Sequence, residues 1–286
     1  MKCLISSRWQ WPRVLNGPPL RECWAIKKRD SLSFFSVGDV ELEYKFIKCK
    51  SDRPTIVLLH EGLGCVATWK DFPDKLAQKT GLSVLAYSRS GYGRSSPINL
   101  PRPSDFHSRE ALEVLPSVLE KMNVEKHFLL GHSDGASIAI IYAGSKPRPN
   151  LKGLILLSPH LATEKKCVQQ IEKAISLYAT GRLRAQLRKY HGDNTDCAFL
   201  GWSGVWVSPS FIGWNIEQYL LGIDIPLLTF RGADDPYNTA WHVETIRQTV
   251  SSSVEHYELA ESGHSPHVDA FQIVMGSVGD FVKTHQ

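Results

Sequence analysis

The 286-residue sequence lacks the patterns that mark several large classes of protein. It has no apolar run of about 18 residues, the length that a membrane-spanning helix needs, so we expect no integral membrane segment. Its formal net charge of +4 is too small to indicate nucleic-acid binding. It has no Gly-Lys-Ser/Thr loop, and the pair Gly91-x-Gly93 lacks a third glycine, which argues against nucleotide binding. We also find no internal repeat and no low-complexity tract.

Cysteine is sparse and scattered along the chain. The six cysteines include no C-x-x-C pair, and no Cys/His cluster has the spacing of a zinc site. We therefore expect no metal, no cofactor and reduced thiols, as in a cytoplasmic protein. The cysteines are Cys3, Cys23, Cys49, Cys65, Cys167 and Cys197.

The N-terminal stretch differs in composition from the rest. Residues 1–32 are rich in basic residues, tryptophan and proline, and no acidic residue precedes Glu22. The apolar stretch Cys3-Leu4-Ile5 is too short for the core of a secretion signal. We expect a flexible N-terminal extension, with an organellar transit peptide as the alternative.

From residue 33 onward, strand patterns alternate with helix patterns. Alternating apolar residues predict two antiparallel strands over 33–49, joined at Gly38-Asp39. Such an order of elements is typical of an α/β protein with a mostly parallel sheet, here of eight strands, with helices on both faces. Apolar runs predict the other strands over 55–60, 83–87, 127–131, 151–157, 225–230 and 254–259. Helices are expected over 69–79, 110–122, 136–142, 240–250 and 268–283.

One long segment interrupts this alternation. The stretch 163–190 has a helical, basic pattern, and 199–221 is rich in aromatic residues. An insertion of this size suggests a helical cap over the carboxyl edge of the sheet. We predict a core of residues 33–159 and 223–286 and a cap at 160–222. We expect the basic stretch to be a solvated helix face rather than an anion-steering patch.

The pentapeptide Gly131-His132-Ser133-Asp134-Gly135 lies between a buried strand and an apolar helix. The pattern G-x-S-x-G is typical of a nucleophile elbow, a sharp turn in which bulky flanking residues would clash. Such a turn would place the Ser133 hydroxyl at a helix N-terminus, where unpaired N–H groups favour a developing negative charge. The pattern also occurs by chance in ordinary turns, so other residues must decide.

Two further strand ends carry groups that would complete a catalytic triad. The strand at 225–230 runs into a loop that holds Asp234 and Asp235, and the last strand runs into Gly263-His264. Functional residues gather at the carboxyl ends of parallel strands. We therefore expect a serine, an aspartate and a histidine to meet at this edge.

From about Phe34 to the C-terminus, the sequence resembles the α/β-hydrolase superfamily, whose order Ser-Asp-His along the chain it follows. The resemblance implies that Asp235 rather than Asp234 is the acid, and it implies an inserted helical cap. It is nearest to small esterases and meta-cleavage C–C hydrolases. The matching motifs are His60-Glu61-Gly62-Leu63-Gly64, Gly91-x-Gly93-x-Ser95, Gly131-x-Ser133-x-Gly135, Gly232-x-x-Asp235 and Gly263-His264.

The sequence departs from the family at two points. Glu61 replaces the usual glycine of the oxyanion loop, so we expect the N–H of Gly62 or Leu63 to act together with that of Asp134. Ser88 stands where an aspartate normally precedes the Gly-x-Gly loop. Glu61 and Asp134 both flank the site, where they would repel an anion, bind a polar group or only hold neighbouring residues.

The cap supplies candidates for the substrate pocket. Glu61, Trp202, Trp206 and Trp214 are predicted to line an apolar cavity with few polar groups. The alternative is that the tryptophans only attach the cap to the core.

The predicted activity is that of a serine hydrolase. His264 would take the proton of Ser133, Asp235 would hold the imidazole, and an acyl-enzyme would form. The substrate would be a small, largely apolar ester, or a related thioester, lactone or C–C bond. A serine nucleophile disfavours epoxide hydrolysis and dehalogenation through an aspartyl ester. A ligand-binding receptor and a non-hydrolytic lyase or perhydrolase are the alternatives, and a homodimer is left open.

Overall fold

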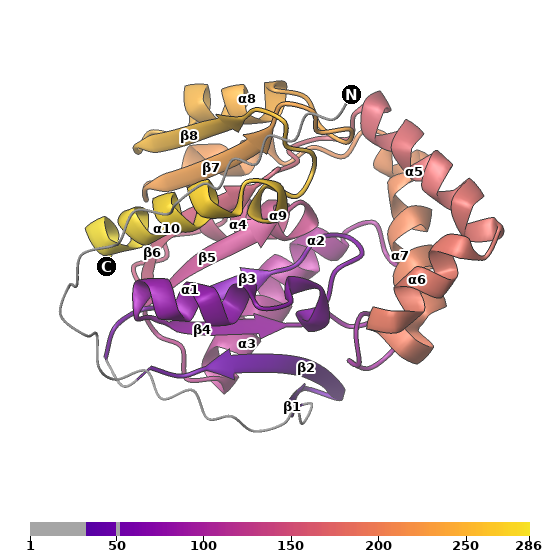
Figure 1. The fold of residues 1–286 in the computed structure, drawn as a ribbon, viewed down its shortest axis with the longest axis horizontal. Helices are drawn as coiled ribbons and strands as arrows, with labels where there is room; N and C mark the ends of the chain where they lie inside the picture. Colours follow the sequence, from indigo (N-terminus) through magenta and orange to yellow (C-terminus); the bar gives the residue numbers. More distant parts are fainter. Residues whose placement is uncertain (1–32, 50–51) are drawn as a thin grey trace, which may run out of the picture.

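The computed structural model describes residues 33–49 and 52–286, and the predicted N-terminal extension lies outside them. An eight-stranded sheet has the strand order β1-β2-β4-β3-β5-β6-β7-β8 (Figure 1). β2 pairs antiparallel with both β1 and β4, and the other pairs are parallel. The predicted fold class, a mostly parallel α/β sheet with helices on both faces, is confirmed.

The elements follow the predicted order. The strands are β1 (Ser33–Val37), β2 (Val40–Ile47), β3 (Thr55–Leu59), β4 (Ser83–Tyr87), β5 (His127–His132), β6 (Leu151–Leu157), β7 (Leu227–Gly232) and β8 (Val254–Leu259). The α-helices are α1 (Phe72–Thr80), α2 (Phe106–Arg109), α3 (Leu115–Lys121), α4 (Asp134–Gly144), α5 (Lys165–Ala179), α6 (Arg182–His191), α7 (Thr195–Trp206), α8 (Trp241–Thr249), α9 (Pro266–Asp269) and α10 (Phe271–His285). Short 3-10 segments lie at η1 (Val66–Trp69), η3 (Gly192–Asn194), η4 (Pro209–Phe211) and η5 (Glu217–Gly222), and η2 (Glu110–Val114) is a π-helical turn.

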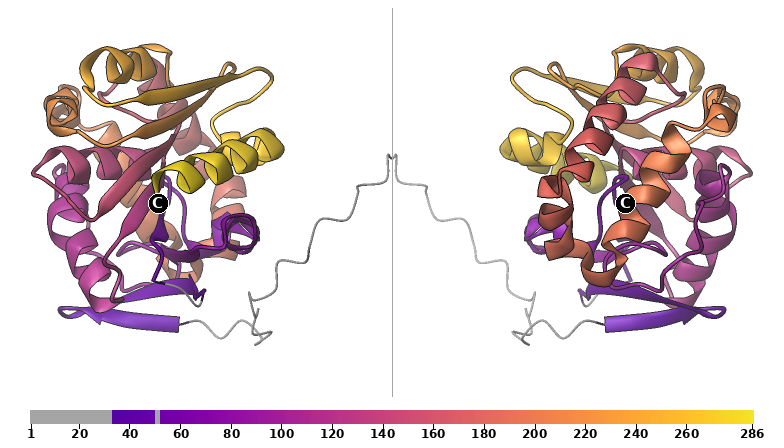
Figure 2. Two further views of the ribbon diagram at one scale, coloured as in Figure 1. Left: turned by 90° about the vertical axis from the view of Figure 1, so that its left-hand side faces the viewer. Right: turned by 90° about the vertical axis from the view of Figure 1, so that its right-hand side faces the viewer.

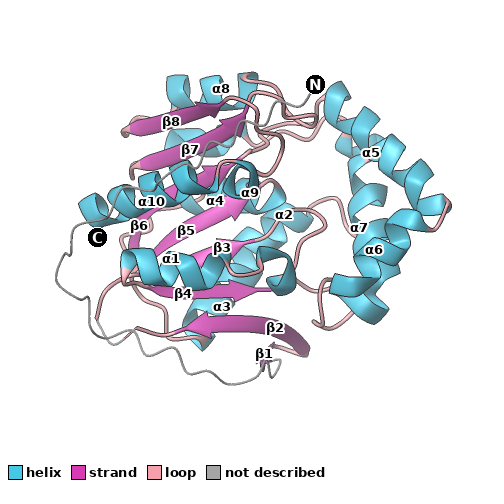
Figure 3. Ribbon diagram, viewed as in Figure 1, coloured by secondary structure: helices cyan, strands magenta, loops and turns pink. Residues whose placement is uncertain are grey.

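The central strands are buried on both faces. Helices α1 and α10 lie on one face of the sheet, and α3 and α4 lie on the other (Figure 3). Ile56 and Leu58 of β3 pack in a layer with α1 and α10, whereas Val57 and Leu59 pack in the opposite layer with α3, α4 and α8. Successive side chains of a strand point to opposite faces, so each layer takes every second residue. Full burial of one such side chain contributes about 1.5–3 kcal/mol, and the two layers fix the strand ends that carry the site.

The helix predicted over 110–122 is irregular. It begins with α2, passes through the π-helical turn and continues as α3. Pro116 has no N–H to donate, and its ring crowds the carbonyl group four residues earlier, which favours a wider turn. Leu112, in the π-helical turn, is 40% exposed, so this part of the helix does not bury all of its apolar side chains.

Helices α5, α6 and α7 connect β6 to β7, and we call the segment Lys165–Trp206 the helical insert. It stands at the carboxyl end of the parallel strands (Figures 1 and 2). The continuous helical pattern of the sequence is divided here between α5 and α6. None of the helices in the described ranges is both long and apolar enough to span a membrane.

Candidate active site

Ser133 is the turn between β5 and α4. Its backbone φ angle is +52°, in the left-handed region that residues other than glycine seldom adopt. Its N–H donates to the carbonyl oxygen of Leu157 at 2.9 Å, which ties the turn to the end of β6. The backbone therefore has the strand–turn–helix form that the motif predicts, with Ser133 at the N-cap of α4.

Glycine on each side makes this turn possible. A Cβ atom on Gly135 would lie 2.0 Å from the carbonyl oxygen of Leu59, and one on Gly131 would lie 2.4 Å from the carbonyl oxygen of Gly135. Such contacts are far inside van der Waals distance. Helix α4 can therefore approach β3 and the end of β5 only because these positions lack side chains.

The structure brings the three residues of the predicted triad together. Nε2 of His264 lies 2.9 Å from Oγ of Ser133, and its Nδ1 lies 2.8 Å from Oδ2 of Asp235. The other carboxylate oxygen accepts hydrogen bonds from the N–H groups of Tyr237 and Asn238 at 2.8 and 3.3 Å. Burial alone would raise the pKa of Asp235, but its bond with His264 and the charge of that ring lower it. An ionised carboxylate is thus favoured beside the imidazole.

A further histidine, His132, supports this arrangement and was missed. Its Nε2 donates to the backbone carbonyl of His264 at 2.7 Å, and its Nδ1 lies 3.5 Å from Oε2 of Glu61. Burial lowers the pKa of His132, but Glu61 more than offsets this and raises it. Burial raises the pKa of Glu61, and the hydrogen bond and charge of His132 outweigh it and lower that pKa. Glu61 is therefore an ionised carboxylate. His132 could have been selected from the sequence, because it lies inside the G-x-S-x-G motif.

The loop after β3 is anchored by Arg89, which the sequence analysis did not select. Its guanidinium donates to the carbonyl oxygens of His60 and Glu61 at 2.6 and 3.0 Å. Its backbone N–H donates to Nε2 of His60 at 3.1 Å, while Nδ1 of that ring donates to the carbonyl of Glu61. These bonds fix the backbone of the loop that carries Gly62 and Leu63.

The missing aspartate at position 88 is replaced from another strand. The hydroxyl of Ser88 donates to Oε2 of Glu43 in β2 at 2.7 Å, and the N–H of Arg94 donates to the same oxygen at 3.0 Å. Ser88 Oγ also accepts from the N–H of Val66 at 2.9 Å. A buried carboxylate is thus present beside the Gly-x-Gly loop although its residue is distant in sequence.

A cavity of about 160 Å³ opens in front of Ser133. Its lining includes eight residues that the sequence analysis named: Glu61, Gly62, Leu63, Ser133, Asp134, Trp202, Trp206 and His264. It also includes four residues that the sequence analysis did not propose for the site: His160, Cys167, Ile171 and Tyr237. His160 lies shortly after the end of β6, so its position at a strand end could have identified it as a site residue.

Trp214, predicted to line the pocket, is not in the lining of this cavity. Its ring stacks on Phe211 with the centroids 5.0 Å apart and on His107 at 4.8 Å. It belongs to an aromatic cluster that joins the helical insert to α2. For Trp214, the structure therefore agrees with the alternative prediction, in which a tryptophan attaches the cap to the core.

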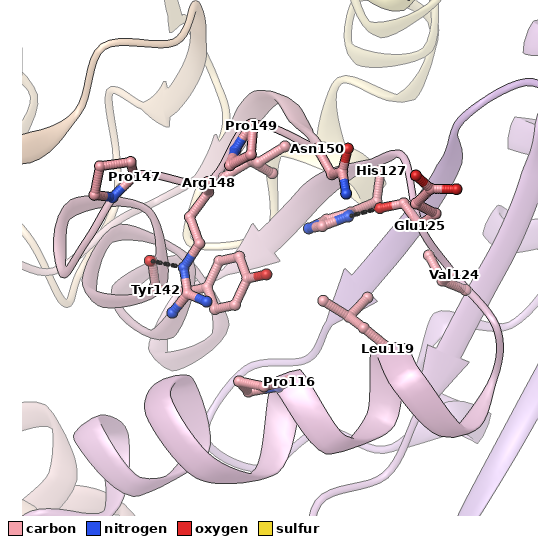
Figure 4. A pocket seen from close by; sticks show the side chains of 11 residues that line it. Pro116, Leu119, Val124, Glu125, His127, Tyr142, Pro147, Arg148, Pro149 and Asn150 are labelled. Atoms are coloured by element: carbon pink, nitrogen blue, oxygen red, sulfur yellow. Dashed lines mark hydrogen bonds between the residues drawn. The ribbon is translucent and has the colours of Figure 1, made fainter.

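A second cavity, of about 280 Å³, lies by the amino end of β5, between α3 and the end of α4 (Figure 4). His127 Nδ1 donates there to the carbonyl of Glu125, and Nε of Arg148 donates to the carbonyl of Tyr142. None of the triad residues lines it. In the ranges 33–49 and 52–286, no group of three His, Cys, Asp or Glu side chains is placed to hold a metal ion.

Known proteins share this sequence and fold. The family model of the α/β hydrolase fold matches residues 54–189. The proline iminopeptidase of Lactobacillus delbrueckii subsp. lactis is 30% identical over 216 residues, which cover 73% of this chain and 69% of that protein. Other Lactobacillus iminopeptidases match over 40–51% of their length. The human protein named Serine hydrolase BPHL is 27% identical over 239 residues, covering 82% of this chain and 80% of its own.

Solved structures agree with the fold. A carboxylesterase structure from the thaumarchaeon Nitrososphaera gargenis superposes with a TM-score of 0.71 at 19% identity, covering 88% of this chain and 99% of that one. The chain belongs to the α/β-hydrolase superfamily and is a hydrolase of that fold.

Proposed function

We propose that this protein is a serine hydrolase that cleaves a carboxylic ester of a small, largely apolar substrate. The proposal rests on one observation, the hydrogen-bonded path from Ser133 Oγ through the His264 ring to Asp235 Oδ2, with steps of 2.9 and 2.8 Å. These distances are within the reach that proton transfer requires.

In the proposed reaction, Nε2 of His264 accepts the Ser133 proton as Oγ attacks the carbonyl carbon. The N–H of Asp134, with that of Gly62 or Leu63, stabilises the oxyanion, each donor contributing about 2.7–4 kcal/mol. The C–O bond then breaks, and the imidazolium gives its proton to the departing alcohol. Water, deprotonated by the same ring, attacks the acyl-enzyme and releases the acid. Asp235 remains ionised and stabilises the imidazolium.

We further propose that residues 160–222 are a lid on a core of residues 33–159 and 223–286. Trp202 and Trp206 of α7 line the cavity in front of Ser133, which supports this role. Both indole side chains supply apolar surface for the substrate and exclude water from the reacting atoms.

Amide hydrolysis is the second candidate, favoured by the 30% identity to a proline iminopeptidase. Thioesters, lactones and activated C–C bonds would share the same acyl-enzyme. Ester and amide hydrolysis are separated by comparing phenyl esters with anilides of one acyl group, because only the leaving atom differs.

Replacing Ser133 with alanine tests the proposal. We expect Ser133→Ala to abolish turnover of short-chain aryl esters and covalent labelling by a fluorophosphonate, because no other group supplies the nucleophile. Ser176→Ala, on the solvent side of α5, is the matched control and should keep both activities. Labelling with no turnover of any ester, thioester or anilide would favour the receptor reading. A Ser133→Ala protein with near wild-type turnover would overturn the proposal.

A further inference from the structure

A buried ring nitrogen without a partner lies in the lining of the second cavity, at the opposite end of β5 from Ser133. We call this space of about 280 Å³ the amino-edge cavity. Among the described residues, none donates to or accepts from Nε2 of His127, a residue only 3% exposed. Figure 4 shows this nitrogen pointing away from Glu125, towards the side of the cavity that holds Tyr142 and Arg148. Burying a polar atom without a partner is costly, so its exposure to a cavity indicates a ligand.

The tautomer of His127 decides which kind of group it would bind. Its Nδ1 lies 2.8 Å from the carbonyl oxygen of Glu125. A carbonyl oxygen can only accept, so Nδ1 carries the proton. Burial lowers the pKa of His127, and the charge of Arg148 adds to this, although the bond with the Glu125 carbonyl opposes it. The ring is therefore neutral, and Nε2 is an acceptor that needs a donor from the ligand.

Arg148 brings a positive charge to the same space. Its Cζ lies 3.9 Å from the centroid of the Tyr142 ring, and the centroid of the His127 ring lies 5.9 Å from that of Tyr142. Nε and Nη2 of Arg148 donate to the Tyr142 carbonyl and the Ser145 hydroxyl at 3.1 and 3.3 Å. In the described part of the chain, Nη1 has no acceptor. A guanidinium with open N–H groups binds a carboxylate well.

The backbone holds these two groups in place. Pro147 and Pro149 flank Arg148, and their rings restrict the conformation of this turn. The N–H of His127 donates to the carbonyl oxygen of Asn150 at 2.9 Å, which ties the turn to the start of β5. The cavity is therefore formed before a ligand arrives, and binding does not have to order it.

The rest of the lining suits a small molecule with an apolar body. Pro116, Leu119 and Val124 supply apolar surface. Glu125 is the acidic residue of the described lining, and its side chain is exposed to water. In Figure 4 its carboxylate lies on the far side of the His127 ring from Arg148. Solvent therefore screens the repulsion between Glu125 and an anion held by Arg148.

We propose that the amino-edge cavity binds a small 2-hydroxy carboxylic acid with an apolar side chain. The carboxylate pairs with Arg148, the adjacent hydroxyl donates to Nε2 of His127, and the apolar part lies against Leu119 and its neighbours. Because a 2-hydroxy acid carries its donor next to its charge, one such molecule can use both groups beside the Tyr142 ring. The described lining shares no residue with the cavity in front of Ser133, so this site is separate from the proposed hydrolase function.

Mandelate is the probe, and isothermal titration calorimetry of the full-length chain measures its binding. Phenylacetate lacks only the hydroxyl, O-methylmandelate has no proton to donate, and mandelamide lacks the charge. We expect the better-bound enantiomer of mandelate to bind one to one with a Kd below about 1 mM. Phenylacetate and O-methylmandelate should bind about 5- to 10-fold more weakly, because each leaves the buried Nε2 without a donor. Mandelamide should bind at least about 10-fold more weakly, because it cannot pair with the guanidinium.

Two variants then locate the site. Arg148→Gln, in a half-buried turn residue, should weaken mandelate binding at least about 10-fold and leave ester turnover unchanged. Arg182→Gln, exposed on α6, removes the same charge elsewhere and should keep the wild-type Kd. His127→Phe keeps an aromatic ring but removes the acceptor, so mandelate and phenylacetate should bind it alike.

The comparison of probes on the wild-type protein does not depend on the folding of any variant. Equal binding of mandelate and phenylacetate, or no binding of mandelate up to about 10 mM, overturns the proposal. Undiminished mandelate binding in Arg148→Gln places the ligand elsewhere and also overturns it. An absence of ester turnover by the wild-type protein bears only on the hydrolase function, because these titrations do not use Ser133.

Discussion

Asp235 contacts the His264 ring through one nitrogen atom, Nδ1. The carboxylate accepts from Nδ1, and in the proposed reaction this leaves Nε2 to accept the proton of Ser133. An amide at this position could present its NH₂ to Nδ1 and stabilise the wrong tautomer, although the fold would be unchanged.

We therefore expect Asp235→Asn to lower kcat for aryl esters by about 10⁴-fold, the loss known for the aspartate-to-asparagine change in a Ser-His-Asp triad. Asp234→Asn is the matched control, because the neighbouring side chain is exposed. Steady-state kinetics on one ester compares the two. A larger loss in Asp234→Asn would show that the family spacing selected the wrong acid.

Some contacts of single residues could be predicted from the sequence, and others could not. Ser133 and His264 were predictable because each follows a strand in a loop with a characteristic glycine. The same pattern left Asp234 and Asp235 as candidates for the acid, and the family resemblance selected Asp235. The partnership of Glu43 with Ser88 was not, because it joins β2 to the end of β4 across 45 positions. No local pattern encodes a contact between side chains that only the sheet brings together.

At the scale of elements, the elbow depends on the close approach of α4 to β3. We expect Gly135→Ala to lower the free energy of unfolding by about 1–3 kcal/mol, because its methyl group would overlap the Leu59 carbonyl and force the helix outward. Ester turnover should fall as well, since Ser133 moves with the helix.

Gly204→Ala is the control for the loss of glycine flexibility. This helical residue of α7 has no atom within 4 Å of the added methyl group. It should raise the free energy of unfolding, by about 0.5–1 kcal/mol, because alanine is the better helix former. Denaturant unfolding measures both variants, and similar values for the two would contradict a steric role for Gly135.

The helical insert is joined to the loop after β7 by Glu164, which precedes α5. Its carboxylate accepts from the N–H and hydroxyl of Thr239 at 3.0 and 2.7 Å and lies 2.7 Å from Nε2 of His242. Burial raises the pKa of Glu164, but these partners outweigh burial and lower it to about 2. Lys166 reaches the same loop and donates to the carbonyl of Asp235 at 2.5 Å.

Because the folded state lowers this pKa, Glu164 stabilises the fold above the pKa of an unfolded glutamate, and the contribution is lost as pH falls towards 2. We expect Glu164→Gln to lower the free energy of unfolding by about 1–3 kcal/mol at pH 7 and progressively less below about pH 4.5. Urea unfolding at several pH values measures this. Glu172→Gln, exposed on the same helix, should show no such trend, and a pH-independent loss in Glu164→Gln would refute the electrostatic origin.

At the scale of the whole molecule, the main charged feature is the basic stretch in α5 and α6. The net charge is +4, and most basic side chains of α5 and α6 are exposed. Exposed charges are screened over about 10 Å at 0.1 M salt, so a solvated face has little effect on a neutral ligand. The cytoplasmic location and the homodimer stay predictions.

We therefore expect kcat/KM for a neutral aryl ester to change by less than about twofold between 0.05 and 0.5 M NaCl. A fall of tenfold or more would instead identify the basic stretch as a steering surface.

The sequence by itself determined the order of strands and helices, the class of sheet and the three groups of the candidate triad. These depend on residue periodicity and on short motifs at strand ends, which are properties of neighbouring residues. The tertiary structure alone decided that Glu61 pairs with His132, that Arg89 holds the loop after β3 and that Trp214 packs away from the cavity. Those contacts join residues far apart in sequence, and they exist only because packing of the two layers and the helical insert fixes where each side chain can reach.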